Sequence, residues 1–145
     1  MSSSFPAPWS LHPQLDADSL AIAELPLCRV QLANDANYPW LILVPRRYGA
    51  TEIIDLDAAD RARLMVEIDM AARALRATVP CDKLNVAALG NMVPQLHVHI
   101  IARRTTDPAW PRPVWGAVAA RAYDPPALSA LVAALRGHLT PDAPP

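Results

Sequence analysis

Residues 95–101, with the sequence QLHVHII, alternate polar and apolar side chains and constrain the fold more than any other part of the chain. Successive side chains of a β-strand point to opposite faces of its sheet, so this alternation predicts a strand over residues 94–102. Gln95, His97 and His99 then share one face, spaced about 6.6 Å apart. The opposite face, turned to the core, carries Leu96, Val98 and Ile100. A row of hydrogen-bonding side chains on a rigid strand can meet a phosphate group or a metal ion.

The length and charge of the chain restrict the classes of protein to consider. Its 145 residues suit one domain with a sizeable core. We expect a single domain over residues 1–145, with the core at 25–104 and a C-terminal loop and helix at 105–140. The 13 basic and 14 acidic side chains nearly balance, so composition gives no electrostatic reason to expect binding to nucleic acid or a membrane surface.

The cysteines and the start of the chain bear on its location. Cys28 and Cys81 are too few for a disulfide framework, and we expect both to be free thiols in a cytoplasmic protein. Residues 1–6 lack the basic segment and apolar run of a signal peptide. No apolar stretch approaches the roughly 20 residues that a membrane helix needs.

Three further strands are predicted before residues 94–102. Residues 27–33 alternate, and residues 40–44 form an unbroken apolar run typical of a central strand that is covered on both faces. A turn at residues 34–37 separates them. Residues 84–88 are predicted to form another strand. The short turn at Gly90 and Asn91 predicts that it pairs antiparallel with the strand at residues 94–102, called the histidine strand below.

Two helices are predicted. Asp57 is the expected N-cap of a long helix that ends near Thr78, before Pro80. Its buried stripe is expected to be Leu64, Ile68, Ala71 and Leu75. Asp124, followed by two prolines, starts a last helix. Its apolar face is expected to be Leu128, Leu131, Val132, Leu135 and Leu139. This order of elements predicts an α+β fold in which an antiparallel sheet of about five strands packs against one long helix.

The region from Leu84 to Arg103 resembles the histidine triad (HIT) superfamily of nucleotide-binding hydrolases and transferases. The signature of that superfamily is His-φ-His-φ-His-φ-φ, where φ is apolar, and residues 95–101 match it at six of seven positions. Gln95 replaces the first histidine, as in a bacterial branch of small HIT proteins. The preceding residues 90–94, GNMVP, also fit, and the resemblance extends back to about Cys28.

This resemblance implies a HIT-like fold and a specific chemistry. His97 would attack the α-phosphorus of a nucleoside phosphoramidate or dinucleotide and form a nucleotidyl-histidine intermediate, which water or another acceptor would resolve. The attacking imidazole must be neutral and held in one tautomer, and a nearby backbone carbonyl would suffice for that. His99 and Gln95 would donate hydrogen bonds to the phosphate. The resemblance also implies a homodimer, and we expect no cofactor.

The remaining contacts to the nucleotide are expected from neighbouring turns. Asn91 and the backbone N–H groups around Gly90 would add donors to the phosphate. Asn85 on the preceding strand, or the turn at residues 34–35, would meet the ribose.

Departures from the usual HIT pattern, above all at Gln95 and Met92, suggest a second hypothesis. Gln95 cannot carry positive charge. Met92 stands where many members have Ser or Thr near the leaving group, and methionine donates no proton. Trp40 stands where many have histidine. The resemblance therefore implies either an active nucleotide hydrolase or transferase, or a catalytically weak nucleotide-binding or sensor protein.

Two other interpretations of the histidine strand remain open. His97 and His99 can form a metal pair, but a metal needs a third and usually a fourth ligand. No local spacing supports the candidates, which are His12, His138, Asp107 and Cys28. Alternatively, the histidines simply occupy an exposed strand face. We expect no metal, and no role for His12 or His138.

The loop after the histidine strand is rich in proline and tryptophan. Trp110 and Trp115 can stack on a base or cover a dimer seam, but packing of the loop onto the core is the preferred interpretation. The arginines that flank the strands are expected in solvent. They are Arg46, Arg47, Arg103 and Arg104.

Overall fold

The computed structural model describes residues 8–139 and contains a five-stranded antiparallel sheet. The expectations for residues 1–6 lie outside the described range. The spatial order of the strands is β1-β2-β3-β5-β4. Their bounds are β1 Ser19–Glu24, β2 Cys28–Ala33, β3 Trp40–Pro45, β4 Lys83–Ala87 and β5 Val98–Arg103. The predicted α+β fold is confirmed, with β3 at the centre of the sheet.

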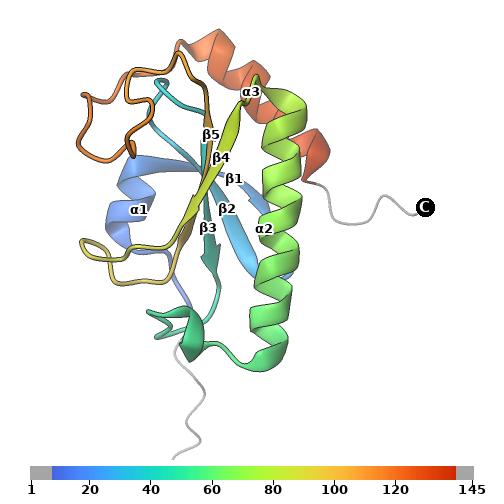
Figure 1. Cartoon of the computed structure of the whole chain (residues 1–145). Coiled ribbons are helices and arrows are strands. Elements are labelled where there is room, and N and C mark those ends of the chain that lie inside the picture. Colours follow the sequence, from blue (N-terminus) through green and yellow to red (C-terminus); the bar gives the residue numbers. More distant parts are fainter. Residues whose placement is uncertain (1–7, 140–145) are drawn as a thin grey trace, which may run out of the picture.

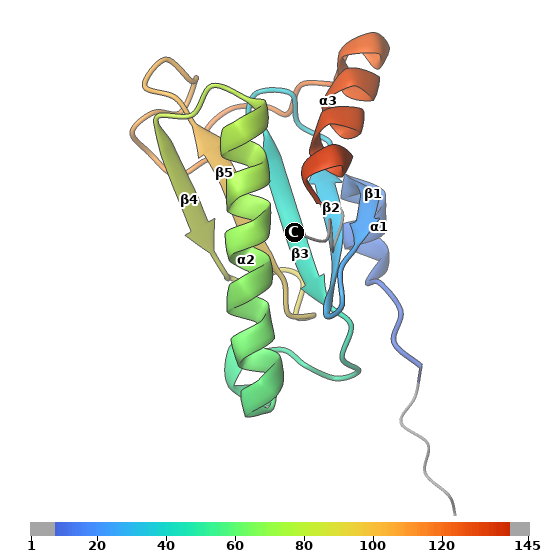
Figure 2. The ribbon, with the colours of Figure 1, turned by 90° about the vertical axis from the view of Figure 1, so that its right-hand side faces the viewer.

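Helices cover the sheet unequally. The long α2 (Ala58–Thr78) and the C-terminal α3 (Pro125–His138) lie across one face, in contact with each other (Figure 2). The short α1 (Pro13–Asp18) lies on the opposite side of the sheet, together with the β4–β5 connection and the loop that precedes α3 (Figure 1). A 3-10 turn, η1 (Ile53–Asp55), precedes α2. One face of the sheet is therefore closed by regular helices and the other mostly by loops.

The main core lies between the sheet and the helices α2 and α3. It contains apolar side chains from β2, β3 and β5 together with both helices, and among them are Leu96, Val98 and Ile100, as the alternation predicts. The apolar face predicted for α3 is also confirmed, since Val132, Leu135 and Leu139 are buried and the two other leucines pack against the core.

The helix α2 begins as predicted, because the Asp57 carboxylate accepts a hydrogen bond from the backbone N–H of Asp60 at 2.8 Å. Three members of the expected stripe are buried and Ile68 is partly buried. Glu67 lies in the same stripe and is fully buried, which the apolar pattern does not predict.

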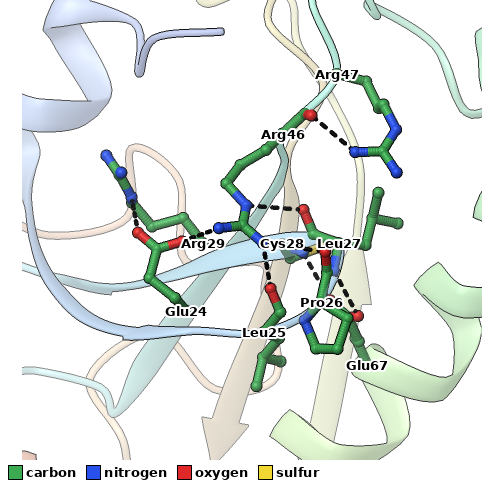
Figure 3. Close-up of polar contacts among 9 residues, drawn as sticks. All are labelled: Glu24, Leu25, Pro26, Leu27, Cys28, Arg29, Arg46, Arg47 and Glu67. Atoms are coloured by element: carbon green, nitrogen blue, oxygen red, sulfur yellow. Dashed lines mark hydrogen bonds and ion pairs between the residues drawn. The ribbon is translucent and has the colours of Figure 1, made fainter.

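Glu67 is buried because it accepts hydrogen bonds from the start of β2 (Figure 3). Its carboxylate accepts from the backbone N–H groups of Leu27 and Cys28 at 2.9 and 2.7 Å. The guanidinium of Arg63 lies 2.6 Å from the same carboxylate. These partners replace the water that a buried carboxylate loses. Burial, reinforced by the neighbouring Glu67, raises the pKa of the Cys28 thiol far above its usual value. Both cysteines are free, as expected.

The structure differs from the predictions in two ways. First, α1 and β1 were not predicted: α1 has only six residues, and the exposed Leu20 beside the buried Ile22 makes β1 a weakly patterned edge strand. Second, β5 begins at Val98 instead of residue 94. The preceding residues leave the ladder because the backbone N–H of Leu96 donates to the carbonyl of Ala50, outside the sheet.

Candidate active site

A cavity of about 680 Å³ opens on the loop-covered face of the sheet, and both predicted histidines line it. The strand β5 supplies His99, and His97 is the residue directly before it. Both side chains are largely buried, each with 6% of its surface exposed. Residues far apart in the sequence complete the wall, among them Leu15, Asp18, Ala33, Asn34, Asp35, Trp40, Ile42, Gly90, Asn91, Met92 and Trp115.

One hydrogen bond determines which nitrogen of His97 is free. Nδ1 of His97 lies 2.7 Å from the backbone carbonyl oxygen of Gln95. A carbonyl oxygen only accepts, so Nδ1 carries the proton and donates it. In the neutral ring the lone pair is then on Nε2, as a nucleophile requires. A backbone carbonyl suffices to hold the ring in this tautomer, and Gln95 provides one.

His99 has the opposite tautomer. The indole N–H of Trp40 donates to Nδ1 of His99 at 3.0 Å, so Nδ1 is an acceptor and the ring proton is on Nε2. The two imidazole rings meet edge to face, with centroids 4.8 Å apart. Burial, assisted by the nearby His97, lowers the pKa of His99 to about 4. When both rings are neutral, the pair therefore presents one lone pair, on Nε2 of His97, and one N–H donor, on Nε2 of His99.

Trp115 forms an aromatic wall with Trp40 around His99. The ring of Trp115 lies edge-on to His99 at 5.0 Å between centroids, and edge-on to Trp40 at 5.7 Å. The proline-rich loop packs onto the core through Ala109 and Val114, and it places Trp115 in the cavity wall. The contact of Trp40 with His99 was not predicted, because it depends on the pairing of β3 with β5, which aligns Ile42 with His99.

The turn before β5 and the turn after β2 face the same cavity. Gly90 and Asn91 both line it, and Gly90 has a φ of +76°, a conformation that favours glycine. Asn34 and Asp35 line it as well. One carboxylate oxygen of Asp35 accepts from the backbone N–H of Asn37 at 2.9 Å, which stabilises the turn.

Two predicted site residues have their amide groups engaged elsewhere. The side chain of Gln95 accepts from the backbone N–H of His12 and donates to the carbonyl of Ser10, both at 2.8 Å. Asn85 accepts from Arg103 at 2.8 Å. Neither residue is among those lining the histidine cavity. Gln95 instead contributes its backbone carbonyl to the site and attaches the segment before α1.

Arg103 corrects the expectation that the flanking arginines lie in solvent. Only 1% of it is exposed, and its guanidinium lies 2.7 and 3.0 Å from the two carboxylate oxygens of Asp107. The rings of Tyr38 and Trp110 lie within 6 Å of it. Burial alone would raise the pKa of Asp107, but hydrogen bonds from Arg103 and from backbone N–H groups lower it to about 2. This ion pair secures the start of the loop that carries Trp115.

Arg46 and Arg47 also have partners. Arg46 lies 2.6 Å from Glu24 and donates to backbone carbonyls of the β1–β2 turn (Figure 3). Arg47 pairs with Asp60 at 2.6 Å. Arg104 is exposed, as expected.

The metal alternative lacks ligands in the described part of the chain. Over residues 8–139, no three side chains of His, Cys, Asp or Glu gather closely enough to hold a metal ion. His12 instead caps α1 by accepting from the backbone N–H of Gln14. Within the same range, no helix is both long and apolar enough to cross a membrane.

The fold and the histidine cavity are those of a histidine triad protein, and a HIT domain family model matches residues 14–106. The chain belongs to the HIT family. It is similar to a histidine triad protein from Bradyrhizobium japonicum, with 56% identity and a TM-score of 0.91, covering 92% of this chain and 99% of that one.

Two further solved structures are similar along nearly their whole length. A histidine triad protein from Marinobacter aquaeolei VT8 has 43% identity and a TM-score of 0.88, covering 92% of this chain and 97% of that one. A histidine triad protein from Sinorhizobium meliloti 1021 has 40% identity and a TM-score of 0.87, covering 90% and 97%. The comparison with curated proteins found no match.

Proposed function

We propose that this protein is a nucleotide-binding hydrolase or nucleotidyl transferase that uses His97 as its nucleophile. Its substrate would be a nucleoside phosphoramidate or a dinucleotide. The supporting observation is the hydrogen bond from Nδ1 of His97 to the Gln95 carbonyl, because it leaves Nε2 with the lone pair in a ring that lines the cavity.

The proposed reaction has two steps. The Nε2 lone pair of His97 attacks the α-phosphorus, and the bond from phosphorus to the leaving group breaks. The leaving group takes that electron pair and a proton from solvent, because Met92 has no proton to donate. The positive charge on the nucleotidyl-imidazole is stabilised by the Gln95 carbonyl, which accepts from Nδ1. Water then attacks phosphorus, the N–P bond breaks, and a nucleoside monophosphate and a proton are released.

The other residues of the cavity would bind the nucleotide. The Nε2–H of His99, the Asn91 side chain and the backbone N–H groups near Gly90 would donate to the phosphate oxygens. The turn of Asn34 and Asp35 is the better candidate for the ribose, because Asn85 is engaged with Arg103. Gln95 would act mainly through its backbone.

A second candidate is a nucleotide-binding or sensor protein with little turnover. Met92 favours it, since this side chain lines the cavity but cannot protonate a leaving group. Tight binding of a nucleoside monophosphate without release of product from any nucleotide substrate would support this second function.

We also propose a homodimer. The strand β4 forms an edge of the sheet and exposes Val86, and the helix α2 exposes Met65 and Val66. An uncovered edge strand with exposed apolar neighbours suits pairing with a second copy. Sedimentation equilibrium tests this, and Val86→Lys should shift a dimer toward monomer.

The deciding experiment is incubation with adenosine 5′-phosphoramidate or diadenosine triphosphate. We expect release of AMP and, after rapid quenching without acid, an added nucleotidyl mass on the intact protein. His97→Ala should abolish both signals. The matched control is His138→Ala, because His138 is exposed on α3, away from the cavity. Retention of activity in His97→Ala would reject the mechanism.

A further inference from the structure

The peptide group between Gln95 and Leu96 orients the nucleophile proposed above, although it precedes the sheet ladder. Its carbonyl accepts from Nδ1 of His97 at 2.7 Å, and its N–H donates to the carbonyl of Ala50 at 3.0 Å. The strand β5 begins only at Val98, so the ladder starts after this peptide. The orientation of the His97 ring therefore depends on contacts that reach Gln95 from other segments.

The side chain of Gln95 makes such contacts with the segment before α1. Its amide oxygen accepts from the backbone N–H of His12, and its amide nitrogen donates to the backbone carbonyl of Ser10, both at 2.8 Å. This pair of hydrogen bonds is called the Gln95 clamp below. Because the clamp uses both the donor and the acceptor of one planar amide, it fixes the side chain in one orientation and restrains the attached backbone.

A small cavity of about 170 Å³ marks the place where three segments meet. Its wall contains Trp9 and Ser10 from the N-terminal segment, residues 48–51 from the loop after β3, and Gln95 itself. The loop also supplies Ala50, whose carbonyl accepts from the peptide that orients His97. This peptide is thus held at its N–H by the loop and, through the clamp, by the N-terminal segment.

The N-terminal segment continues into α1, which lines the histidine cavity at Leu15 and Asp18. This part of α1 has attachments of its own. The backbone carbonyl of Asp18 accepts from the N–H of Asn34 at 2.9 Å, and that of Leu15 accepts from the Ser19 hydroxyl. Both bonds persist without Gln95. The clamp therefore acts on the orientation of His97 more than on the wall that would meet the nucleotide.

We infer that Gln95 is a positioning residue whose side-chain amide, by binding the backbone of Ser10 and His12, keeps the proton of His97 on Nδ1. This inference rests on the proposed function, in which His97 is the nucleophile. Without the clamp, the Gln95 carbonyl shifts away from Nδ1, and a fraction of the His97 rings adopts the other tautomer. In that tautomer Nε2 carries the proton and cannot attack phosphorus. Loss of the clamp should therefore lower kcat and change KM little.

Two substitutions of His12 test the clamp from its far side. The backbone of His12 has a φ of −56° and a ψ of 135°, which proline also adopts. His12→Pro therefore deletes the N–H that Gln95 accepts, together with the imidazole that caps α1 at Gln14. His12→Ala deletes the imidazole alone and is the matched reference. Relative to it, kcat for AMP release from adenosine 5′-phosphoramidate should fall by about tenfold in His12→Pro, with KM within about threefold.

Nitrogen-15 NMR of His97 tests the positioning role without any substrate. We expect the Nδ1–H tautomer in the native protein and in His12→Ala, and a mixture of tautomers in His12→Pro. Should His12→Pro fail to fold, Gln95→Met removes the same clamp with an apolar side chain of similar length. Equal His97 spectra with and without the clamp would overturn the inference. If the native protein releases no AMP, the proposed function fails, and the spectra alone decide whether the clamp sets the tautomer.

Discussion

The indole of Trp40 donates its N–H to Nδ1 of His99 at 3.0 Å, with the two rings tilted by 58°. Two neighbouring strands thus decide the tautomer of a buried histidine. Nδ1 of His97 donates and Nδ1 of His99 accepts, so the two rings present complementary groups.

Removal of this indole donor should change the state of His99. In Trp40→Phe, Nδ1 of His99 loses its donor, so we expect mixed tautomers and a pKa above the native value of about 4. Nitrogen-15 NMR of the imidazoles measures both properties. AMP release should fall by about tenfold if His99 donates to the phosphate. Trp115→Phe keeps the ring contact and is the control. An unchanged His99 spectrum in Trp40→Phe would contradict the assigned tautomer.

The low pKa of His99 predicts weaker folding in mild acid. The unfolded chain binds a proton at this histidine near pH 6.5, whereas the folded chain does so only near pH 4. Stability therefore falls as the pH decreases from 6.5 toward 4. From pH 7 to pH 5 the loss should be about 2 kcal/mol. Urea unfolding at the two pH values measures it, and His99→Gln should show a smaller loss. Equal losses in both proteins would rule out His99 as the source.

The buried ion pair of Arg103 and Asp107 should be far more important for stability than an exposed pair. Asp107→Asn leaves a buried guanidinium without a counter-charge, and we expect a loss of about 3–5 kcal/mol in unfolding free energy. The pair of Arg73 and Asp69 is largely exposed to solvent, so Asp69→Asn should lower the unfolding free energy far less. Denaturant titration compares them. Similar losses in the two variants would mean that the burial of Arg103 is energetically irrelevant.

Gln95 offers a test of a structural role against direct phosphate binding. Gln95→Ala removes the hydrogen bonds to Ser10 and His12, so stability should decrease by about 1–2 kcal/mol. KM should change by less than about threefold, because the backbone carbonyl that binds His97 remains. A KM increase of tenfold or more with unchanged stability would show that the amide contacts the substrate instead.

Much of the fold is predictable from local patterns. The apolar run of β3 predicts a central strand, and the Asp57 cap and the apolar spacing after it predict α2. Burial is less predictable where polar side chains are involved. No sequence pattern marks Glu67 or Arg103 as buried. Both are buried because hydrogen-bond and ion-pair partners satisfy their charged groups in the folded chain.

The sequence by itself determined that His97 and His99 belong to a polar row opposite a core-facing row, since side-chain alternation is a local property of extended backbone. Only the tertiary structure decided what each polar atom contacts. The Trp40 donor is 59 residues from His99 in sequence, and the Gln95 amide bonds a residue 83 positions away. Such contacts depend on strand register and loop packing, which the alternation of one strand does not contain.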